Sequence, residues 1–424
     1  MIETSLIILS ILSLTISLIA IRIKRRSKLI VETGNRNRQE DKVVNIEELL
    51  NRSIIKREVS HFVKGYQNET ILITGAGGSI GSELTKQILD YEVKKVILLD
   101  QSESALYNLH WELKRKDKLN FETVLADICD KVRIDHIFQE YRPTIVFHAA
   151  GNKAIPLVEN APYEAIKTNV EGTKILADAS SHYNAKKFVF LSTDKAAIPV
   201  NVVGVTKRIA EQYINSLNSL GKTKYITTRF GNVIGPRGSI VPILKMQLER
   251  GGPLMITHKQ VSRFFMTESE VSNLILEASL MGNGGEIFVF DMGESVRIYD
   301  LAKNMIRLAG YRYPEDIDIK IVGLRPGEKL YEELLASGEN TLPTYHEKIM
   351  LAKNRKFDYA KVKMKIDELC VSNKFLNMNV IEKMKELVPE YISNNTHEYK
   401  DALLPDESID EYMEKLNNLF YKEG

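Results

Sequence analysis

The stretch Thr74-Gly75-Ala76-Gly77-Gly78-Ser79-Ile80-Gly81 decides the fold of this chain. It follows the short apolar run Thr70–Thr74 and opens the helical pattern of Ile80–Leu89, so it joins a predicted strand to a predicted helix. Its G-x-x-G-x-x-G spacing allows a tight turn and lets backbone N–H groups at the helix start meet a pyrophosphate. We therefore predict a dinucleotide site that includes Gly75, Gly78, Ser79, Ile80 and Gly81.

Acidic residues at two strand ends bear on the choice of cofactor. Asp100 ends the second predicted strand, nineteen residues after Gly81. A carboxylate there can bind both hydroxyls of an adenosine ribose and would repel a 2′-phosphate, so we predict NAD rather than NADP. Asp127 ends the third predicted strand and is interpreted either as a contact of the adenine ring or as a loop cap.

The fourth predicted strand ends in His148-Ala149-Ala150-Gly151. Small residues are expected where backbone lies along a cofactor, so Ala149 and Ala150 join the predicted NAD site. Ile128, next to Asp127, is added to it. We interpret His148 as a structural histidine rather than a base.

The segment Ser192-Thr193-Asp194-Lys195 follows the fifth predicted strand, at the sheet edge where open α/β folds bind ligands. On the next predicted helix, Val203 and Lys207 lie one turn apart and face the same way. A Rossmann-fold dehydrogenase places a Ser/Thr and a Tyr-x-x-x-Lys pair at these points, but here Val203 stands in place of the tyrosine. We expect Lys207 to hold the nicotinamide ribose. The predicted catalytic residues are Thr193, Asp194, Lys195 and Lys207.

Six apolar runs alternate with helical patterns between residues 69 and 235, which is typical of a parallel, doubly wound sheet. The six predicted strands are 70–74, 95–99, 122–126, 144–149, 187–191 and 225–229. We predict a Rossmann-type NAD-binding domain over 69–235 and a smaller substrate lobe over 236–350, interleaved with the sheet. A helical C-terminal extension over 351–424 follows.

The N-terminus has a different character. Thr4–Ile21 carries no charge, and its eighteen residues would span roughly 27 Å as a helix, close to the thickness of a bilayer core. Arg22 and four further basic residues follow within 22–28. A cleavable signal peptide has the reverse charge order, so we predict an uncleaved transmembrane anchor over 1–28, then a linker and docking helix over 29–68. The positive-inside rule places the remainder in the cytoplasm, as a single-pass protein of the inner membrane.

Composition narrows the remaining possibilities. The 424 residues are 44% hydrophobic and 27% charged, with a net charge of +2. This ordinary globular composition gives no reason to expect nucleic acid as a partner, and no metal site is predicted. The two cysteines fit a reducing compartment, and Cys129 is interpreted as a buried small residue.

At this point a resemblance to a known family is visible in eight ordered motifs. They are T-G-A-G-G-S-I-G-S-E-L (74–84), H-A-A-G-N-K (148–153), T-N-V-E-G-T (168–173), S-T-D-K-A (192–196), R-F-G-N-V (229–233), R-F-F-M-T (263–267), D-M-G-E (291–294) and L-R-P-G-E-K-L-Y-E-E-L (324–334). The chain resembles the extended short-chain dehydrogenase/reductase superfamily and, within it, the membrane-associated UDP-N-acetylglucosamine 4,6-dehydratases of the bacterial polysaccharide biosynthesis family. The resemblance covers about residues 45–340.

The resemblance implies a reaction in three stages. NAD takes a hydride from carbon 4 of the sugar, water is lost across carbons 5 and 6, and the hydride returns to carbon 6. Thr193 would hydrogen-bond the 4-hydroxyl, Asp194 would protonate the departing 6-hydroxyl, and Lys195 would be the base at carbon 5. Lys195 can do so only if burial or a cationic neighbour lowers its pKa.

The resemblance also implies substrate contacts for UDP-N-acetylglucosamine or a related UDP-sugar. Arginine suits this task because its guanidinium binds phosphate oxygens in pairs, although a surface ion pair is the alternative for Arg263 and Arg325. By analogy with the fold we also expect a homo-oligomer. The predicted substrate-binding residues are Lys153, Asn169, Asn232, Arg263, Arg325 and Glu328.

Val203 departs from the family pattern, in which a Tyr or Met is found. The group that deprotonates the 4-hydroxyl therefore stays open between Asp194, Lys195 and a water held by Thr193. Two other functions compete with a dehydratase. A nucleotide-sugar epimerase, or a dehydratase that also epimerises carbon 5, is one; a non-catalytic NAD- or UDP-sugar-binding scaffold at the membrane is the other.

Overall fold

The computed structural model describes residue 49 and residues 62–235, 239–333, 341–352, 356–374 and 380–393. Residues 1–49 and 50–424 form two separate units, and the description below concerns the second. The predicted anchor lies outside the described residues, as do residues 29–61 of the predicted linker and docking helix, except for Leu49. No helix in the described part of the chain is long and apolar enough to cross a bilayer.

A nine-stranded sheet forms the centre of the second unit, in the order β14-β15-β11-β6-β5-β4-β1-β2-β3. The seven strands β3, β2, β1, β4, β5, β6 and β11 are parallel, while β15, near one edge, pairs antiparallel with both β11 and β14. Their bounds are β1 Thr70–Thr74, β2 Lys95–Asp100, β3 Phe121–Leu125, β4 Ile145–His148, β5 Lys187–Leu191, β6 Lys224–Arg229, β11 Ile287–Phe290, β14 Thr341–Pro343 and β15 Ile349–Ala352. The order reverses between β1 and β4, which is the switch point where such sheets bind ligands.

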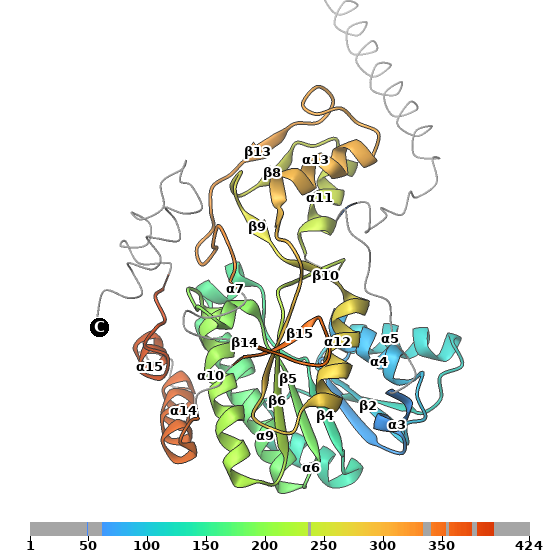
Figure 1. Ribbon diagram of the computed structural model, residues 1–424, viewed down its shortest axis with the longest axis vertical. Helices are drawn as coiled ribbons and strands as arrows, with labels where there is room; N and C mark the ends of the chain where they lie inside the picture. The colour runs from blue at the N-terminus through green and yellow to red at the C-terminus, as the bar shows by residue number, and fades with distance from the viewer. Residues whose placement is uncertain are drawn as a thin grey trace, which may run out of the picture. The chain divides into compact units, whose positions relative to one another are not determined.

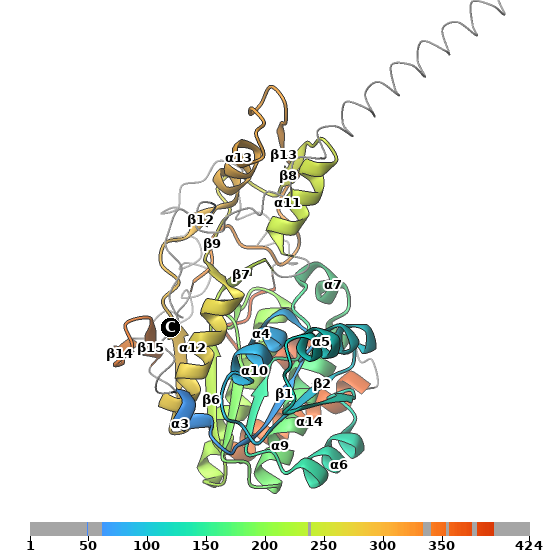
Figure 2. The same ribbon diagram turned by 90° about the vertical axis from the view of Figure 1, so that its right-hand side faces the viewer.

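Helices cover both faces of the sheet, because successive strand residues point to opposite sides. Leu72 packs in one core cluster, whereas its neighbours Ile71 and Ile73 pack in the other. The Ile71 side is covered by α4 (Ser79–Ile88), α5 (Glu103–Arg115) and α12 (Glu268–Met281), seen together in Figure 2. The opposite side is covered by α6 (Lys131–Tyr141), α9 (Thr173–His182) and α10 (Val202–Leu217).

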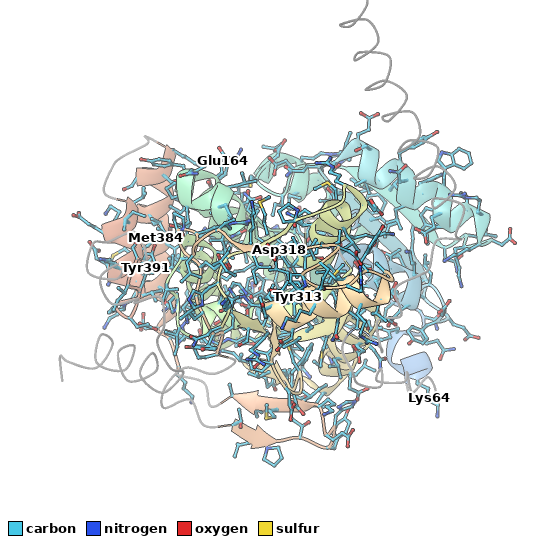
Figure 3. All side chains as sticks on the ribbon, turned by 90° about the horizontal axis from the view of Figure 1, so that it is seen from above. Lys64, Glu164, Tyr313, Asp318, Met384 and Tyr391 are labelled. Atoms are coloured by element: carbon cyan, nitrogen blue, oxygen red, sulfur yellow. The ribbon has the colours of Figure 1, made fainter. Side chains whose placement is uncertain are left out.

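A further helical layer lies outside α10. Helices α14 (Tyr359–Lys374) and α15 (Val380–Leu387) join the same core cluster as α10, so every residue of α10 except Asn215 is buried. The view from above shows Met384 and Tyr391 of this layer at one side of the unit (Figure 3). The described part of the predicted extension is therefore helical, but it begins only after β15 has joined the main sheet.

The long helix predicted near 163–183 is divided in the structure. It consists of α8 (Pro162–Ala165), a π-helical segment η1 (Ile166–Gly172) and α9. The π-helical segment places Asn169 against the Gly151–Asn152 backbone, where Asn169 Oδ1 accepts a hydrogen bond from Asn152 N at 2.7 Å. Such π-helical insertions are common near functional sites.

The second lobe lies beyond the carboxyl ends of the parallel strands (Figures 1 and 2). It contains α11 (Ile240–Glu249), β8 (Leu254–Ile256), β9 (Ser262–Arg263), β12 (Val296–Arg297), α13 (Ile298–Leu308) and β13 (Ile319–Ile321). Residues 265–290 return to the main body: β10 (Phe265–Thr267) pairs with β7 (Asn232–Ile234), α12 packs on α4, and β11 joins the sheet.

The last residues of the predicted linker and docking helix over 29–68 pack within the second unit. Residues Phe62–Tyr66 form the short helix α3, and Tyr66 is fully buried. The Tyr66 hydroxyl donates a hydrogen bond to Leu276 O at 2.8 Å, on α12. Tyr66 also stacks on Tyr91. The compact body therefore begins before residue 69.

Candidate active site

The glycine loop has the geometry of a phosphate cradle. Gly75 adopts φ 66°, and Gly78 N donates to Gly75 O at 3.0 Å, closing the tight turn. A Cβ on Gly81 would lie 2.1 Å from Gly75 O, so only glycine fits there. Helix α4 starts at Ser79 without a side-chain cap from any described residue, which leaves its first N–H groups available to an anion. These residues therefore fit a dinucleotide pyrophosphate.

Asp100 lies beside this loop at the end of β2. Its Oδ2 accepts a hydrogen bond from Gly77 N and its Oδ1 one from Ser102 N, both at 2.9 Å. The carboxylate is thus fixed next to the glycine turn, where the second lone pair of each oxygen can accept ribose hydroxyls. This arrangement fits the predicted preference for NAD.

Asp127 caps the loop after β3, because its Oδ1 accepts a hydrogen bond from Cys129 N at 2.9 Å; the contact with the adenine ring stays a prediction. Ile128 is buried, and its Cδ1 lies 2.7 Å from the position of a Cβ on Gly172. Cys129 donates to Lys167 O, and burial raises the pKa of its thiol to about 12, which does not suit a nucleophile.

The backbone at the end of β4 closes the cofactor site from the other side. Ala149 N donates to Thr74 O at 3.1 Å, and a Cβ on Gly75 would clash with Ala150 N at 2.6 Å. The ring nitrogens of His148 bond Thr74 Oγ1 and Thr173 Oγ1, each at 2.8 Å. Burial, with Lys207 nearby, lowers the pKa of His148 well below its usual value. A neutral, fully paired ring has the structural role that we inferred.

Lys207 lies inside the protein between β4 and β5. Its Nζ donates to Leu191 O at 3.0 Å and lies 4.5 Å from the centre of the Phe190 ring. Burial outweighs the attraction of Glu211 and lowers the pKa of Lys207 to about 8. The amine is also 3.1 Å from the position of a Cβ on Gly151, so it sits against the loop that follows β4.

The segment after β5 forms a short 3₁₀ turn, Asp194–Ala196. Thr193 Oγ1 donates to Asp194 Oδ1 at 2.7 Å, and Lys195 Nζ donates to the same oxygen at 3.0 Å. The Asp194 side chain is fully buried and that of Lys195 nearly so. The structure therefore brings three of the four predicted catalytic side chains into direct contact.

The condition stated for Lys195 as a base, a pKa lowered by burial or a cationic neighbour, is not met in this structure. Burial does disfavour the ammonium, but the carboxylates of Asp194 and Glu332 outweigh it and raise the pKa above its usual value. Glu332 Oε1 lies 3.4 Å from Lys195 Nζ. Lys195 is therefore charged here and must lose a proton before it can act as a base.

Asn232 completes this cluster from β7. Its Oδ1 accepts from Lys195 Nζ at 3.4 Å, while its buried Nδ2 has no hydrogen-bond partner among the described residues. A buried amide without a partner costs free energy, so the site is built for a ligand that accepts a hydrogen bond. Asn232 thus fits the substrate contact expected of it.

Arg263 and Glu328 hold the loop over 325–333 in place. Arg263 Nη2 donates to Lys329 O at 2.7 Å and pairs with Glu328 at 3.4 Å, while Nη1 donates to Leu330 O at 3.1 Å. Glu328 also accepts from Thr257 Oγ1 at 2.8 Å. The resemblance implies that both bind substrate. In the structure both side chains bond groups of the protein, and for Arg263 this includes the ion pair stated as the alternative.

Arg325 differs from Arg263. It is exposed, and its guanidinium has no hydrogen-bond or ion-pair partner among the described residues. Its backbone N donates to Glu328 Oε2 at 3.2 Å, which positions it at the start of the loop. Arg325 is therefore free to meet a phosphate.

Asn169 and Lys153 differ in whether their side chains are exposed to a substrate. The Asn169 side chain bonds the backbone of Asn152 at 2.7 and 3.0 Å and Thr206 Oγ1 at 3.1 Å, and it is fully buried. It supports the loop after β4, and both hydrogens of its Nδ2 are engaged within the protein. Lys153 is exposed, and partial desolvation, opposed by Glu268, lowers the pKa of its amine.

Val203 is packed in an apolar cluster with Val158, Ala165 and Val202. Helix α7 (Ile155–Asn160) supplies Val158 and lies against the start of α10, where Glu159 Oε1 accepts from Val202 N at 2.7 Å. The valine is thus a well-packed core residue in this chain.

Sequence reasoning missed two residues of the site. Glu332 reaches Lys195 from 137 positions further along the chain, and Glu211 accepts a hydrogen bond from Ser192 Oγ at 2.6 Å. Glu332 lies within the quoted motif 324–334 and Glu211 one turn after Lys207. A signal was therefore present for both, but neither carried a role before the fold was known.

The parallel 3-2-1-4-5-6 order, the glycine cradle and the Thr193–Lys195 turn define an extended short-chain dehydrogenase/reductase fold of the epimerase–dehydratase type. The chain belongs to the polysaccharide biosynthesis protein family, whose model matches residues 71–354.

Individual relatives differ in name and in coverage. The chain is 45% identical to the capsular polysaccharide biosynthesis protein CapD of Staphylococcus aureus over 77% of its own length, but it spans only 55% of that protein. It is 33% identical to the inverting UDP-N-acetylglucosamine 4,6-dehydratase of Campylobacter jejuni, over 65% of this chain and 80% of that one. It is 31% identical to a UDP-glucose 4-epimerase of Rickettsia rickettsii, over 83% of this chain and 99% of that one.

Solved structures agree on the fold. The structure of Pen from Bacillus thuringiensis has a TM-score of 0.64 and 31% identity, covering 69% of this chain and 92% of that one. DesIV of Streptomyces venezuelae, a dTDP-glucose 4,6-dehydratase with NAD bound, has a TM-score of 0.56 at 19% identity. The match covers 63% of this chain and 89% of that one.

Proposed function

We propose that this protein is an NAD-dependent nucleotide-sugar 4,6-dehydratase that converts UDP-N-acetylglucosamine to its 4-keto-6-deoxy product for polysaccharide or glycan synthesis. The observation that carries the proposal is the contact of Thr193, Asp194 and Lys195 at the end of β5, with Lys207 on the adjacent helix. A simple epimerase has no need of an acid and an amine at carbons 5 and 6. The similarity to the Campylobacter jejuni dehydratase supports the same choice.

The glycine loop and Asp100 would hold NAD, with the pyrophosphate at the start of α4 and the adenosine ribose on Asp100. Lys207 would hold the nicotinamide ribose next to Gly151. When bound, NAD supplies reversible hydride transfer, from carbon 4 and later to carbon 6. The protein's own residues handle the protons.

Asp194 and Lys195 divide the proton transfers. Asp194 takes the proton released from the 4-hydroxyl and gives it to the departing 6-hydroxyl, while Thr193 aligns the 4-oxygen. Lys195 removes the proton from carbon 5, which the 4-ketone acidifies, and returns a proton to that carbon afterwards. Arg325 and Asn232 bind the UDP-sugar. The guanidinium of Arg325 is exposed, and the buried Nδ2 of Asn232 has no partner among the described residues, so each offers a hydrogen-bond donor to the substrate.

The cellular setting is part of the proposal. The apolar Thr4–Ile21 run and the basic residues after it support a membrane anchor that leaves the site in the cytoplasm. We also propose a homo-oligomer, by analogy with the fold. The anchor would localise the enzyme without taking part in the chemistry.

The test uses the full-length protein with NAD and UDP-N-acetylglucosamine in deuterated water, followed by proton NMR and mass spectrometry. A new 6-methyl signal, the loss of one water and a deuteron at carbon 5 would establish the dehydratase. The configuration at carbon 5 would then show whether the enzyme also epimerises. A product with the 6-hydroxyl retained would establish a 4-epimerase, and binding without turnover would leave the scaffold function.

A further inference from the structure

Glu332 is a buried acidic residue beside Lys195 that has no role in the proposed reaction. Only 2% of its side chain is exposed. Its Oε1 lies 3.4 Å from Lys195 Nζ and 3.8 Å from Arg263 Nε. It is brought there by the loop over 325–333, which Arg263 holds through the carbonyls of Lys329 and Leu330.

Three buried polar atoms around Lys195 lack hydrogen-bond partners among the described residues. They are Asp194 Oδ2, Asn232 Nδ2 and Glu332 Oε2. Each belongs to a side chain whose other polar atom lies within 3.4 Å of Lys195 Nζ. A buried polar atom without a hydrogen-bond partner costs free energy. Three such atoms around one amine are typical of a site whose hydrogen-bond partners change during the reaction.

The charges explain why Lys195 needs a second partner. Two carboxylates face its ammonium, and only Asp194 is already assigned to the leaving hydroxyl. Burial favours the protonated form of Glu332, but the positive charges of Lys195, Arg263 and Lys329 outweigh it and lower the pKa of Glu332, so the resting pair is ionised. An ionised lysine has no lone pair for carbon 5, and its proton must first move to a neighbouring base.

We propose that Glu332 is the proton partner and positioning residue of Lys195, holding Nζ in the site and accepting its ammonium proton when the 4-keto sugar is bound. This inference rests on the proposed function. Lys195 Nζ–H breaks and Glu332 O–H forms, which leaves a neutral amine beside a neutral acid. The amine lone pair takes the carbon-5 proton, the C5–H electrons form the C5–C6 double bond, and the C6–O bond breaks with a proton from Asp194.

The cycle then closes without any further reagent. After hydride has returned to carbon 6, Lys195 gives a proton to carbon 5 and recovers its original proton from Glu332. No net proton is gained or lost, because the proton from the 4-hydroxyl leaves in the water that Asp194 helps to form. The groups facing Glu332 are Lys195 and Arg263 at the distances above, with Lys329 adding a third positive charge.

The experiment compares Glu332→Gln, Glu332→Asp and the control Glu333→Gln in the full-length enzyme with NAD. Glu333 is also buried in an ion pair, but with Lys329 at 2.6 Å rather than with Lys195. Two readouts are followed in deuterated water with UDP-N-acetylglucosamine: formation of reduced nicotinamide, which reports oxidation at carbon 4, and deuterium at carbon 5. For Glu332→Gln we expect oxidation to persist while carbon-5 exchange falls about 100-fold.

Glu332→Asp should recover part of the exchange rate, and Glu333→Gln should remain within a few fold of the wild type. Thermal unfolding checks that each variant is folded; if Glu332→Gln is not, the comparison rests on Glu332→Asp, for which exchange should still fall more than oxidation. Carbon-5 exchange within threefold of the wild type in folded Glu332→Gln would overturn the proposal. If only Glu332→Asp is folded, exchange that falls no more than oxidation would do so.

A second readout does not depend on turnover. The pH dependence of Lys195 acylation by acetic anhydride, followed by mass spectrometry, should shift to lower pH in Glu332→Gln but not in Glu333→Gln. If the wild type does not convert the sugar but the pH dependence of Lys195 acylation still shifts in Glu332→Gln, the proposed function is wrong. The ion pair between Lys195 and Glu332 is then still supported. If the wild type turns over and neither readout responds to Glu332, the inference is wrong and the function stands.

Discussion

The carboxylate of Glu211 binds the guanidinium of Arg229 through two hydrogen bonds, 2.8 Å from Nε to Oε1 and 2.6 Å from Nη2 to Oε2. Arg229 ends β6, Glu211 lies on α10, and neither side chain is more than 2% exposed. Glu211 Oε1 also accepts a hydrogen bond from Ser192 Oγ at 2.6 Å. This pair therefore fixes the end of β5, from which Thr193 to Lys195 follow, relative to the helix that carries Lys207.

Removing the charge of Glu211 should be strongly destabilising. Glu211→Gln leaves the Arg229 guanidinium buried without a counter-charge, which costs about 3–5 kcal/mol of unfolding free energy. Urea denaturation of the wild type and the variant measures this. The double variant Glu211→Leu/Arg229→Met should lose less than Glu211→Leu alone, because no charge is then buried without a partner. A double variant less stable than that single one would contradict this account.

Lys207 should make stability depend on pH in the alkaline range. Its pKa is about 8 in the folded protein and about 10.4 in an unfolded chain. Between these values the unfolded chain binds more protons, so the contribution of Lys207 to unfolding free energy rises with pH, by up to about 3 kcal/mol. Subtracting the unfolding free energy of Lys207→Met from that of the wild type, pH by pH, isolates this part. A difference that is flat from pH 7 to 10 would refute it.

A methyl group at Gly81 should damage the cofactor site. Alanine normally stabilises a helix by about 1 kcal/mol relative to glycine, but a Cβ here would lie 2.1 Å from Gly75 O. We expect Gly81→Ala to raise the Kd for NAD by roughly tenfold or more. Each factor of ten corresponds to about 1.4 kcal/mol of binding free energy. Titration calorimetry measures this. Gly78→Ala, where the nearest atom is 3.1 Å away, should have a smaller effect; equal losses would count against the role of the turn.

Introducing the tyrosine that the family pattern suggests should not improve this enzyme. Val203 is 3% exposed and surrounded by Val158, Ala165 and Val202. A phenol ring there would overpack the cluster and cost about 1–3 kcal/mol. We expect Val203→Tyr to lower both the melting temperature and the turnover, while the flexible side chain of Val203→Met is tolerated. A stable and faster Val203→Tyr enzyme would show that the position faces the substrate.

Local sequence patterns were sufficient for the Rossmann half of the fold. The six strands from β1 to β6 and the glycine turn lie where the alternation of apolar runs predicts them, within one or two residues. The later strands were missed because β11 and β15 are short and separated by an entire lobe. Their pairing depends on contacts between distant segments, which no window of sequence contains.

The protonation state of Lys195 illustrates the same limit. Burial alone would lower its pKa, and the segment around it suggests only Asp194 as a partner. The second carboxylate comes from Glu332, and the two carboxylates together raise the pKa of Lys195 above its usual value. The partners of Arg263 and Asn169 could not be predicted for a similar reason: their residue types suit a sugar or a phosphate, but in the structure they bond backbone groups of the protein.

The antiparallel pair β15 and β14 also protects the edge of the sheet from aggregation. Strand β11 is fully buried and entirely apolar, with residues Ile287–Phe290. Without β15 beside it, its open N–H and C=O groups would be a template for aggregation with other chains. Strand β14 ends at Pro343, which has no N–H to offer a further strand. Truncation before residue 341 would therefore yield an insoluble protein even though the predicted catalytic and cofactor residues are all retained.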